Sequence, residues 1–302
     1  MTVNRASTRI YGGVEGGGTK WACAAGSGPD DIRGITVFAT TSPQETIGRA
    51  AEFFRPWLDE LAAVGLGSFG PIDIRPSSPT WGHITTTPKP GWTDVDVVGS
   101  LQTALGLPIA VDTDVNAAAL GEYRWGAAAG LETFCYVTVG TGIGGGVMTN
   151  GQLMHGLLHP EFGHMRIPHD RGRDSFEGAC PYHGDCLEGL ASGEAMRRRW
   201  GGPGQELGDR EEAWQLEADY LALGLVNVIC TLSPERVVLG GGVMKQPRLL
   251  PLVRSHVRKL MGGYGSAPQL DAKIDEYVVA PALGDRAGVL GAIELAKLSL
   301  HR

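Results

Sequence analysis

The chain has 302 residues, of which 42% are hydrophobic and 20% charged, and its net charge is −7. This length suits two domains of ordinary size, each with its own hydrophobic core. The acidic charge argues against a nucleic-acid partner. No apolar run approaches the roughly 18 residues of a membrane span, and the N-terminus lacks a signal-peptide core. Only five cysteines are present, so a disulfide framework is not expected, and a reducing cytoplasm is the natural compartment.

A glycine-rich hairpin is predicted at the start of the chain. Residues 10–15 are expected to form a buried strand, 16–18 a turn of three glycines, and 19–25 a returning strand. Bare backbone N–H groups beside Thr19 and Lys20 suit a phosphate, although an ordinary tight hairpin would have the same letters. The P-loop pattern of G-x-x-x-x-G-K-[ST] is absent.

The next elements include one clear helix signal. A strand is expected over 34–40, then a helix over 43–54 with Ser42 as N-cap and Pro43 at its first position. A strand over 64–69 is followed by a stretch rich in Pro, Thr and Ser, 72–92, which is more typical of a binding loop than of filler. A helix over 93–105 completes this part.

Two carboxylates lie where a strand over 109–111 gives way to a helix over 116–125. Asp112, Thr113 and Asp114 occupy this junction. Carboxylates at such a position are common helix caps, and α/β enzymes also place reactive groups there. From these residues alone, one of the two aspartates could serve only as a cap.

A second glycine-rich turn, 140–146, follows a predicted strand over 134–139. Its letters fit G-x-G-x-x-G, but a dinucleotide fingerprint requires a helix to begin at that turn. An apolar run ending in Asn150-Gly151, a hairpin signal, follows instead. Strand, glycine turn and strand therefore occur twice, which predicts two related halves. Two such turns on opposite walls of a cleft would suit a nucleoside triphosphate.

Four potential zinc ligands are concentrated in a Pro- and Gly-rich stretch. Cys180, His183 and Cys186 are spaced C-x2-H-x2-C, and His164 precedes them. Two thiolates and two imidazoles complete a tetrahedral zinc set and leave no position open for water, so a structural ion is expected rather than a catalytic one. Buried free cysteines and loop histidines are the alternative.

The remaining elements bring a third glycine cluster. Helices are predicted over 188–200, 211–232, 247–260 and 285–300, and strands over 236–239 and 278–280. Gly240, Gly241 and Gly242 end the strand over 236–239, at the strand end where α/β sheets bind ligands. No low-complexity linker divides the chain. The expected domains are 1–115 plus 286–302, and 116–285.

Taken together, these motifs resemble the ROK family of bacterial sugar kinases, and among them the fructokinases. The segments that carry the resemblance are GVEGGGTK, TPKPGW, DTDVNAAALGE, VTVGTGIGGG, HPEFGH, CPYHGDCLEG and VVLGGGVM. The family implies an α/β, actin/hexokinase-like (ribonuclease H-like) fold of two domains with a cleft between them. It implies ATP-dependent phosphorylation of D-fructose at the 6-hydroxyl, with Mg2+ accompanying ATP, a structural Zn2+ and a homodimer.

The resemblance also implies a role for each matching residue. Asp114 is the general base, and the zinc ligands are His164, Cys180, His183 and Cys186. The sugar contacts are Thr113, Glu161, His164 and Glu188. The nucleotide contacts are Gly17, Thr19, Lys20, Thr141, Gly142, Gly240, Gly241 and Gly242.

Two positions depart from the family pattern. Thr113 stands where many relatives have Asn, and it lacks the paired donor and acceptor of a carboxamide, which argues against glucose recognition on that pattern. Glu15 stands where many have Asp, which leaves the magnesium contact open. A hexokinase acting on mannose or glucose is one alternative. A sugar-responsive transcriptional regulator of this family is another, disfavoured by the acidic charge and the short segment before the first strand.

Overall fold

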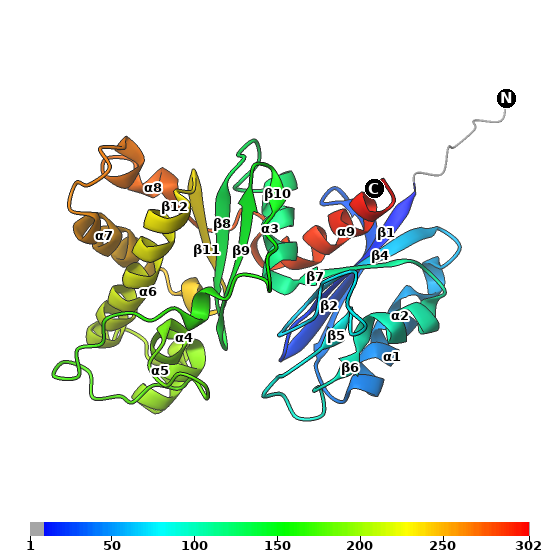
Figure 1. The fold of residues 1–302 in the computed structure, drawn as a ribbon, viewed down its shortest axis with the longest axis horizontal. Coiled ribbons are helices and arrows are strands. Elements are labelled where there is room, and N and C mark those ends of the chain that lie inside the picture. Colours follow the sequence, from blue (N-terminus) through cyan, green and yellow to red (C-terminus); the bar gives the residue numbers. More distant parts are fainter. Residues whose placement is uncertain (1–8, 302) are drawn as a thin grey trace. The chain divides into compact units, whose positions relative to one another are not determined.

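A computed structural model describes residues 9–301 of the chain. Packing divides them into two compact units. Unit 1 comprises residues 9–129, 155–158 and 285–301, and unit 2 comprises 130–154 and 159–284. The elements are shown in Figure 1.

Unit 1 contains β1 (Ile10–Gly16), β2 (Lys20–Gly28), β3 (Asp31–Ala39), α1 (Pro43–Phe54), β4 (Leu61–Ser68), β5 (His83–Ile84), β6 (Val95–Asp96), α2 (Val97–Leu105), β7 (Ile109–Thr113), α3 (Asp114–Trp125) and α9 (Ala287–Ser299). Unit 2 contains β8 (Phe134–Val139), β9 (Ile143–Thr149), β10 (Gln152–Leu153), α4 (Leu187–Ala191), α5 (Gly193–Trp200), α6 (Glu211–Leu232), β11 (Arg236–Gly240), α7 (Leu249–Met261), α8 (Ile274–Tyr277) and β12 (Val278–Val279).

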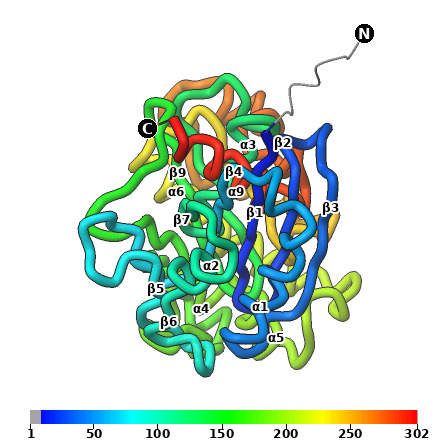
Figure 2. The backbone as a smooth tube through the Cα atoms, turned by 90° about the vertical axis from the view of Figure 1, so that its right-hand side faces the viewer, coloured from blue at the N-terminus to red at the C-terminus, as the bar shows by residue number. Residues whose placement is uncertain are grey.

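The two main sheets share one topology. Their strand orders are β3-β2-β1-β4-β7 in unit 1 and β10-β9-β8-β11-β12 in unit 2. In each sheet the first three strands in this order are antiparallel, and the remaining pairs are parallel. Figure 2 shows β3 at the outer edge of the unit 1 sheet. The predicted internal repeat is therefore confirmed, and each glycine-rich turn joins the first two strands of its half.

Close helix packing decides where unit 1 ends along the chain. A side-chain carbon on Gly291 of α9 would lie 1.6 Å from the backbone oxygen of Ala117, and one on Gly121 of α3 would lie 2.4 Å from that of Ala287. The two helices thus touch backbone to backbone, which only glycine allows. All of α3 consequently belongs to unit 1, and packing places the boundary after Ala129. The boundary expected after residue 115 falls inside the first turn of α3.

Local capping explains where several helices begin. Ser42 caps α1 with Pro43 at the first turn, as predicted. The single helix predicted over 188–200 is wrong, because the chain forms α4 and α5 with a break at Ser192. The Ser192 hydroxyl accepts a hydrogen bond from the Ala195 N–H at 3.1 Å, which starts a new helix. Helix α2 begins only at Val97, because Asp96 caps it.

The core of unit 2 is built around α6. By length and composition α6 could cross a membrane, but 56% of its most apolar stretch is buried inside the unit. Its apolar residues, among them Trp214, Leu221 and Leu225, pack in the same core as strands β8, β9 and β11 and helix α7. Burial in this core accounts for the apolar composition of the helix.

Helix α6 also buries a carboxylate. Glu217 is 1% exposed, and neither side-chain oxygen has a hydrogen-bond partner. Burial raises the pKa of Glu217 well above its ordinary value, and the positive charge of Arg199 opposes this shift only in part. Above the ordinary pKa, the folded chain then binds more protons at this site than the unfolded chain. The stability of the wild-type protein therefore falls as pH rises towards the folded-state pKa.

Replacing this carboxylate is predicted to stabilise unit 2. Glu217→Met keeps the volume and removes an unpartnered polar group, whose burial costs on the order of 1–3 kcal/mol. We expect a higher Tm than wild type, with a gap that widens between pH 5 and pH 8. Thermal melts of both proteins across that range measure the gap. A gap that stays constant with pH would show that Glu217 does not titrate with folding.

Candidate functional site

The β7–α3 junction gives its two aspartates different environments. Thr113 is the N-cap of α3, and its hydroxyl oxygen accepts a hydrogen bond from the Asn116 N–H at 3.1 Å. Asp112 is 3% exposed and fully engaged in hydrogen bonds, whereas Asp114 is only half-buried in the first helical turn. Asp114 is therefore the carboxylate of this pair that a ligand can reach. The Thr113 hydroxyl oxygen accepts this capping bond, and its hydroxyl hydrogen can still be donated to another group.

The first glycine turn, between β1 and β2, is held closed by backbone contacts. Gly17 N–H donates to the Lys20 carbonyl at 2.9 Å, and the Thr40 hydroxyl donates to the Gly17 carbonyl at 2.7 Å. Gly17 thus shapes the turn with its own polar groups. Thr19 and Lys20 are exposed, so their hydroxyl and ammonium groups can meet an anion.

A half-buried carboxylate, Glu15, lies on β1 just before this turn. Burial raises the pKa of Glu15; the nearby Asp285 raises it further, and Lys20 lowers it. A side-chain carbon on Gly288 would come within 2.4 Å of the Glu15 carboxyl carbon, so the start of α9 approaches Glu15 closely. A cation placed beside Glu15 would lower this pKa, because it favours the charged form.

The second glycine turn, between β8 and β9, meets a carboxylate from α4. Ile143 N–H donates to Glu188 Oε2 at 2.9 Å. A side-chain carbon on Gly142 would lie 2.5 Å from the same oxygen, so this glycine leaves room for Glu188. Gly193 N–H donates to the Gly140 carbonyl at 2.7 Å, which fixes the turn against the start of α5. Thr141 is exposed at its tip.

Glu161 and Glu188 lie near each other in unit 2. The Glu161 side chain is 39% exposed. Its partial desolvation, and secondly the negative charge of Glu188, raise the pKa of Glu161 to about 7. His159 Nδ1 lies 3.3 Å from Glu161 Oε1. A carboxylate with a pKa near neutrality changes its hydrogen-bonding role within the physiological pH range, from acceptor when ionised to donor when protonated.

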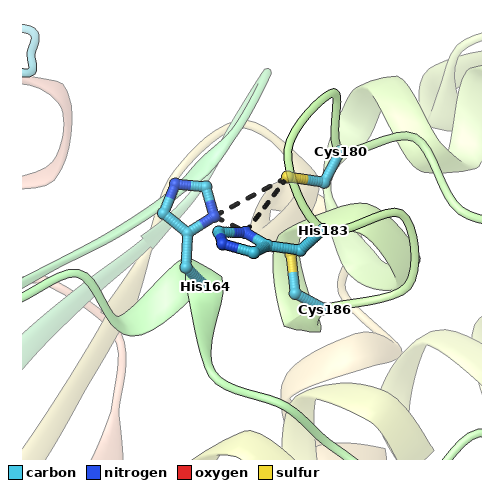
Figure 3. Close-up of side chains that lie close together, drawn as sticks. All are labelled: His164, Cys180, His183 and Cys186. Carbon is cyan, nitrogen blue, oxygen red and sulfur yellow. Dashed lines mark hydrogen bonds between the residues drawn. The ribbon is translucent and has the colours of Figure 1, made fainter.

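The four predicted metal ligands converge on one point, as Figure 3 shows. Their ligand atoms all lie within 4.8 Å of one another. Cys180 Sγ is 3.7 Å from His164 Nδ1 and 3.6 Å from His183 Nδ1, and Cys186 Sγ is 3.8 Å from His164 Nδ1. Bond lengths of about 2.3 Å to sulfur and 2.0 Å to nitrogen put tetrahedral ligands about 3.5 Å apart. The geometry and the donor set both fit a metal of the zinc type.

The metal-ligand loop is also tied to its unit without a metal. Asp185, between His183 and Cys186, lies 3.2 Å from His169 Nδ1 and 3.0 Å from Arg166 Nη2. A buried group earlier in the loop, Asp174, anchors it to α5 and α6. Asp174 Oδ2 lies 3.1 Å from Arg199 Nη2 and accepts a hydrogen bond from Tyr220 at 2.7 Å. These outer contacts orient the ligand-bearing backbone.

The third glycine cluster, at the end of β11, lies beside the second turn. A side-chain carbon on Gly241 would lie 2.4 Å from the Val139 backbone oxygen, and Gly241 has φ of +99°. Gly241 is therefore required by contact with β8 and by its backbone conformation. A side-chain carbon on Gly242 would meet nothing within 4 Å, so Gly242 leaves open space.

The structure thus brings the predicted residues together in local groups. In unit 1, Gly17, Thr19 and Lys20 form one group, and Thr113 and Asp114 form another. In unit 2, one group contains Thr141, Gly142, Glu161, Glu188 and the four metal ligands, and Gly240, Gly241 and Gly242 adjoin it.

Two histidines of these groups were missed by the sequence reasoning. His155 Nε2 contacts Asp112 Oδ2 at 2.8 Å across 43 residues, a separation that no motif encodes. His159 contacts Glu161, and its position two residues before a predicted sugar ligand was a usable signal.

Comparison with known proteins identifies the family of the chain. The ROK family profile matches residues 11–299. The fructokinase of Zymomonas mobilis subsp. mobilis is 46% identical over 295 residues, covering 95% of this chain and 96% of its own. The fructokinase of Lactococcus lactis subsp. cremoris is 40% identical over 287 residues, covering 95% and 96%. The crystal structure of a Streptomyces griseus ROK glucokinase in complex with glucose and AMPPNP has a TM-score of 0.78 and 25% identity, covering 96% of this chain and 99% of that one. The fold is the actin/hexokinase-like fold of these sugar kinases, and this chain belongs to the ROK family.

Proposed function

We propose that this chain is an ATP-dependent fructokinase that transfers a phosphoryl group to the 6-hydroxyl of D-fructose. The observation that carries the proposal is the 46% identity to a fructokinase over nearly the full length of both chains. The local groups of the two units support it. Phosphoryl transfer needs groups that bind the phosphates, a base, and side chains that accept hydrogen bonds from the sugar hydroxyls, and it needs little covalent chemistry from the protein.

Asp114 is proposed as the general base. It is a half-buried carboxylate in the first turn of α3, and its Oδ1 accepts a hydrogen bond from the Val115 N–H at 2.9 Å. One oxygen is thus oriented by the helix, and the carboxylate would accept the proton of the attacking hydroxyl. The exposed Thr19, Lys20 and Thr141 would hold the phosphates of ATP. Mg2+ accompanying ATP would neutralise phosphate charge, and Glu15 and Asp285 are carboxylates close to the first turn.

Sugar hydroxyls are proposed to bind Glu161, Glu188 and His164. Ionised carboxylates accept strong hydrogen bonds from hydroxyl groups. His164 directs Nδ1 towards the cysteines, so its Nε2 would be the nitrogen that meets the sugar. Zn2+ held by His164, Cys180, His183 and Cys186 would supply structural rigidity to this loop.

A coupled ADP-release assay tests the proposal. The purified chain is offered fructose, mannose, glucose and N-acetylmannosamine with ATP and Mg2+. We expect the highest kcat/KM with fructose. Comparable values for mannose or glucose would support the broader hexokinase instead, an alternative favoured by the similarity to a glucokinase. Absence of ADP release with every sugar would contradict the kinase assignment.

The sugar affinity of the enzyme is predicted to depend on pH through Glu161. With its pKa at about 7, Glu161 loses its charge as pH falls from 8 to 6, and its ionised fraction drops about tenfold. We expect the KM for fructose to rise by up to about that factor over the same range. Glu161→Gln should bind sugar more weakly and show a flat KM profile. A wild-type KM that does not change with pH would contradict the role of ionised Glu161.

The remaining parts of the proposal concern location and assembly. A cytoplasmic enzyme is proposed, because the thiols of Cys180 and Cys186 must stay reduced to bind metal. A homodimer is proposed from the family resemblance, and sedimentation of the purified chain tests it. A gel-shift assay tests the regulator alternative, for which no binding to DNA is expected.

A further inference from the structure

Asp112, the carboxylate two residues before Asp114, is held from three directions. Its Oδ1 accepts hydrogen bonds from the Thr113 N–H at 2.8 Å and from Asn116 Nδ2 at 2.7 Å. Its Oδ2 lies 2.8 Å from His155 Nε2. At 3% exposure, such a carboxylate is costly to bury unless donors surround it. The three donors are therefore what allows Asp112 to occupy this position.

The bonds of Asp112 fix the backbone on both sides of Asp114. Thr113 precedes Asp114 in the chain, and Asn116 follows two residues later on α3. Thr113 and Asn116 are also joined directly, because the Thr113 hydroxyl caps the Asn116 N–H. The position of the Asp114 carboxylate therefore depends on how firmly Asp112 holds this junction.

His155 is the only one of these donors that does not come from the junction itself. It follows β10, and segment 155–158 packs with unit 1, although Met154 before it and His159 after it belong to unit 2. The side chain of His155 is 44% exposed, yet Nε2 contacts a carboxylate whose side chain is 4% exposed. An exposed ion pair contributes little, but here the loss of the donor would leave a buried oxygen of Asp112 without that partner.

We propose that His155 is a positioning residue for the general base. By donating to Asp112, it holds the β7–α3 junction so that Asp114 faces the attacking hydroxyl. The inference rests on the proposed function, because it assumes that Asp114 is the base. A displacement of about 1 Å in a reacting group can cost about a hundredfold in rate, so the loosening of one hydrogen bond at this junction is expected to be visible in kcat.

The test compares substitutions of His155 in two backgrounds. His155→Ala is expected to lower kcat for fructose about tenfold or more, with little change in the KM for ATP. His155→Gln keeps an N–H donor and should recover most of the loss. In an Asp114→Asn background, where no base remains to be positioned, His155→Ala should have no further effect. His256→Ala is the matched control, since His256 of α7 is another partly exposed histidine that contacts a carboxylate, with Nδ1 2.7 Å from Asp219 Oδ1, and should leave kcat unchanged.

The outcomes separate the inference from the proposed function. An equal loss in both backgrounds, or a loss that follows a fall in Tm in both His155 variants, would overturn positioning in favour of a general structural role. Normal kcat in His155→Ala, together with a large loss in Asp114→Asn, would overturn the inference alone. Full turnover in Asp114→Asn would overturn both the base and its positioning. A wild-type chain inactive on every sugar would overturn the proposed function and the inference with it.

Discussion

Asp114→Asn is expected to lower kcat for fructose by at least about a hundredfold, because a positioned carboxylate base contributes about 10²–10⁴ in rate. Asn has the shape of Asp and keeps an Oδ1 that can accept from the Val115 N–H. The cap of α3 is Thr113, so the start of the helix does not depend on the charge that is removed. ADP release at saturating fructose and ATP measures kcat, and a thermal melt checks that the fold is intact.

Asp96→Asn provides a matched control in the same unit. Asp96 caps α2, and its Oδ1 accepts a hydrogen bond from the Gly99 N–H at 2.7 Å. Asn is as good a cap as Asp, so this variant removes a carboxylate at a helix start without removing a base. We expect it to keep wild-type kcat. Near-full turnover in Asp114→Asn would mean that Asp114 is not the base, and that the sugar hydroxyl loses its proton elsewhere.

The repeated hairpins could be predicted from the sequence because a glycine cluster between two apolar runs indicates a turn. Glycine is favoured where two strands meet in a tight turn, and the chain carries one such cluster in each half. The same logic located the Asn150-Gly151 turn, where both residues have positive φ, 50° and 71°.

The unit boundary and the break between α4 and α5 could not be predicted from local signals. Helix α3 has no composition change at its ends, and its membership in unit 1 depends on contact with α9, more than 160 residues later in the chain. Ser192 is a residue type that can cap a helix or lie inside one, and its use as a cap accompanies the contacts of Glu188 and Gly193 with the second glycine turn. Both features are consequences of tertiary contacts.

In the candidate site, too, some features could be predicted from local sequence and others depend on tertiary contacts. The metal ligands were predictable because their spacing carries the chemistry, and the structure brings all four together. Two contacts were not predictable, because they join segments far apart in the chain. Glu188 and Ile143 N–H are 45 residues apart, and Asp112 and His155 are 43 residues apart. Thr113 was assigned to the sugar from the family pattern alone, and the structure uses its oxygen as a helix cap.

Cys180→Ser is expected to release the metal and to raise the KM for fructose about tenfold or more, with a much smaller change in the KM for ATP. Glu161 lies three residues before the ligand His164, and Glu188 lies two residues after the ligand Cys186. Both carboxylates proposed for the sugar are therefore attached to the metal cluster. Thr19 and Lys20 are held instead by β1 and β2 of unit 1. Metal analysis of the purified variant and the two KM values test the prediction.

Cys230→Ser is the matched control, because Cys230 is an exposed thiol on α6 outside the cluster, and it should change neither KM nor metal content. Binding of a structural zinc contributes about 10–16 kcal/mol in small peptides, as much as the whole stability of a typical domain, about 5–15 kcal/mol. The contacts of Asp185 and Asp174 also stabilise the loop, and they do not involve the metal. If metal-free Cys180→Ser keeps a wild-type KM for fructose, those contacts are sufficient, and the metal adds only thermal stability.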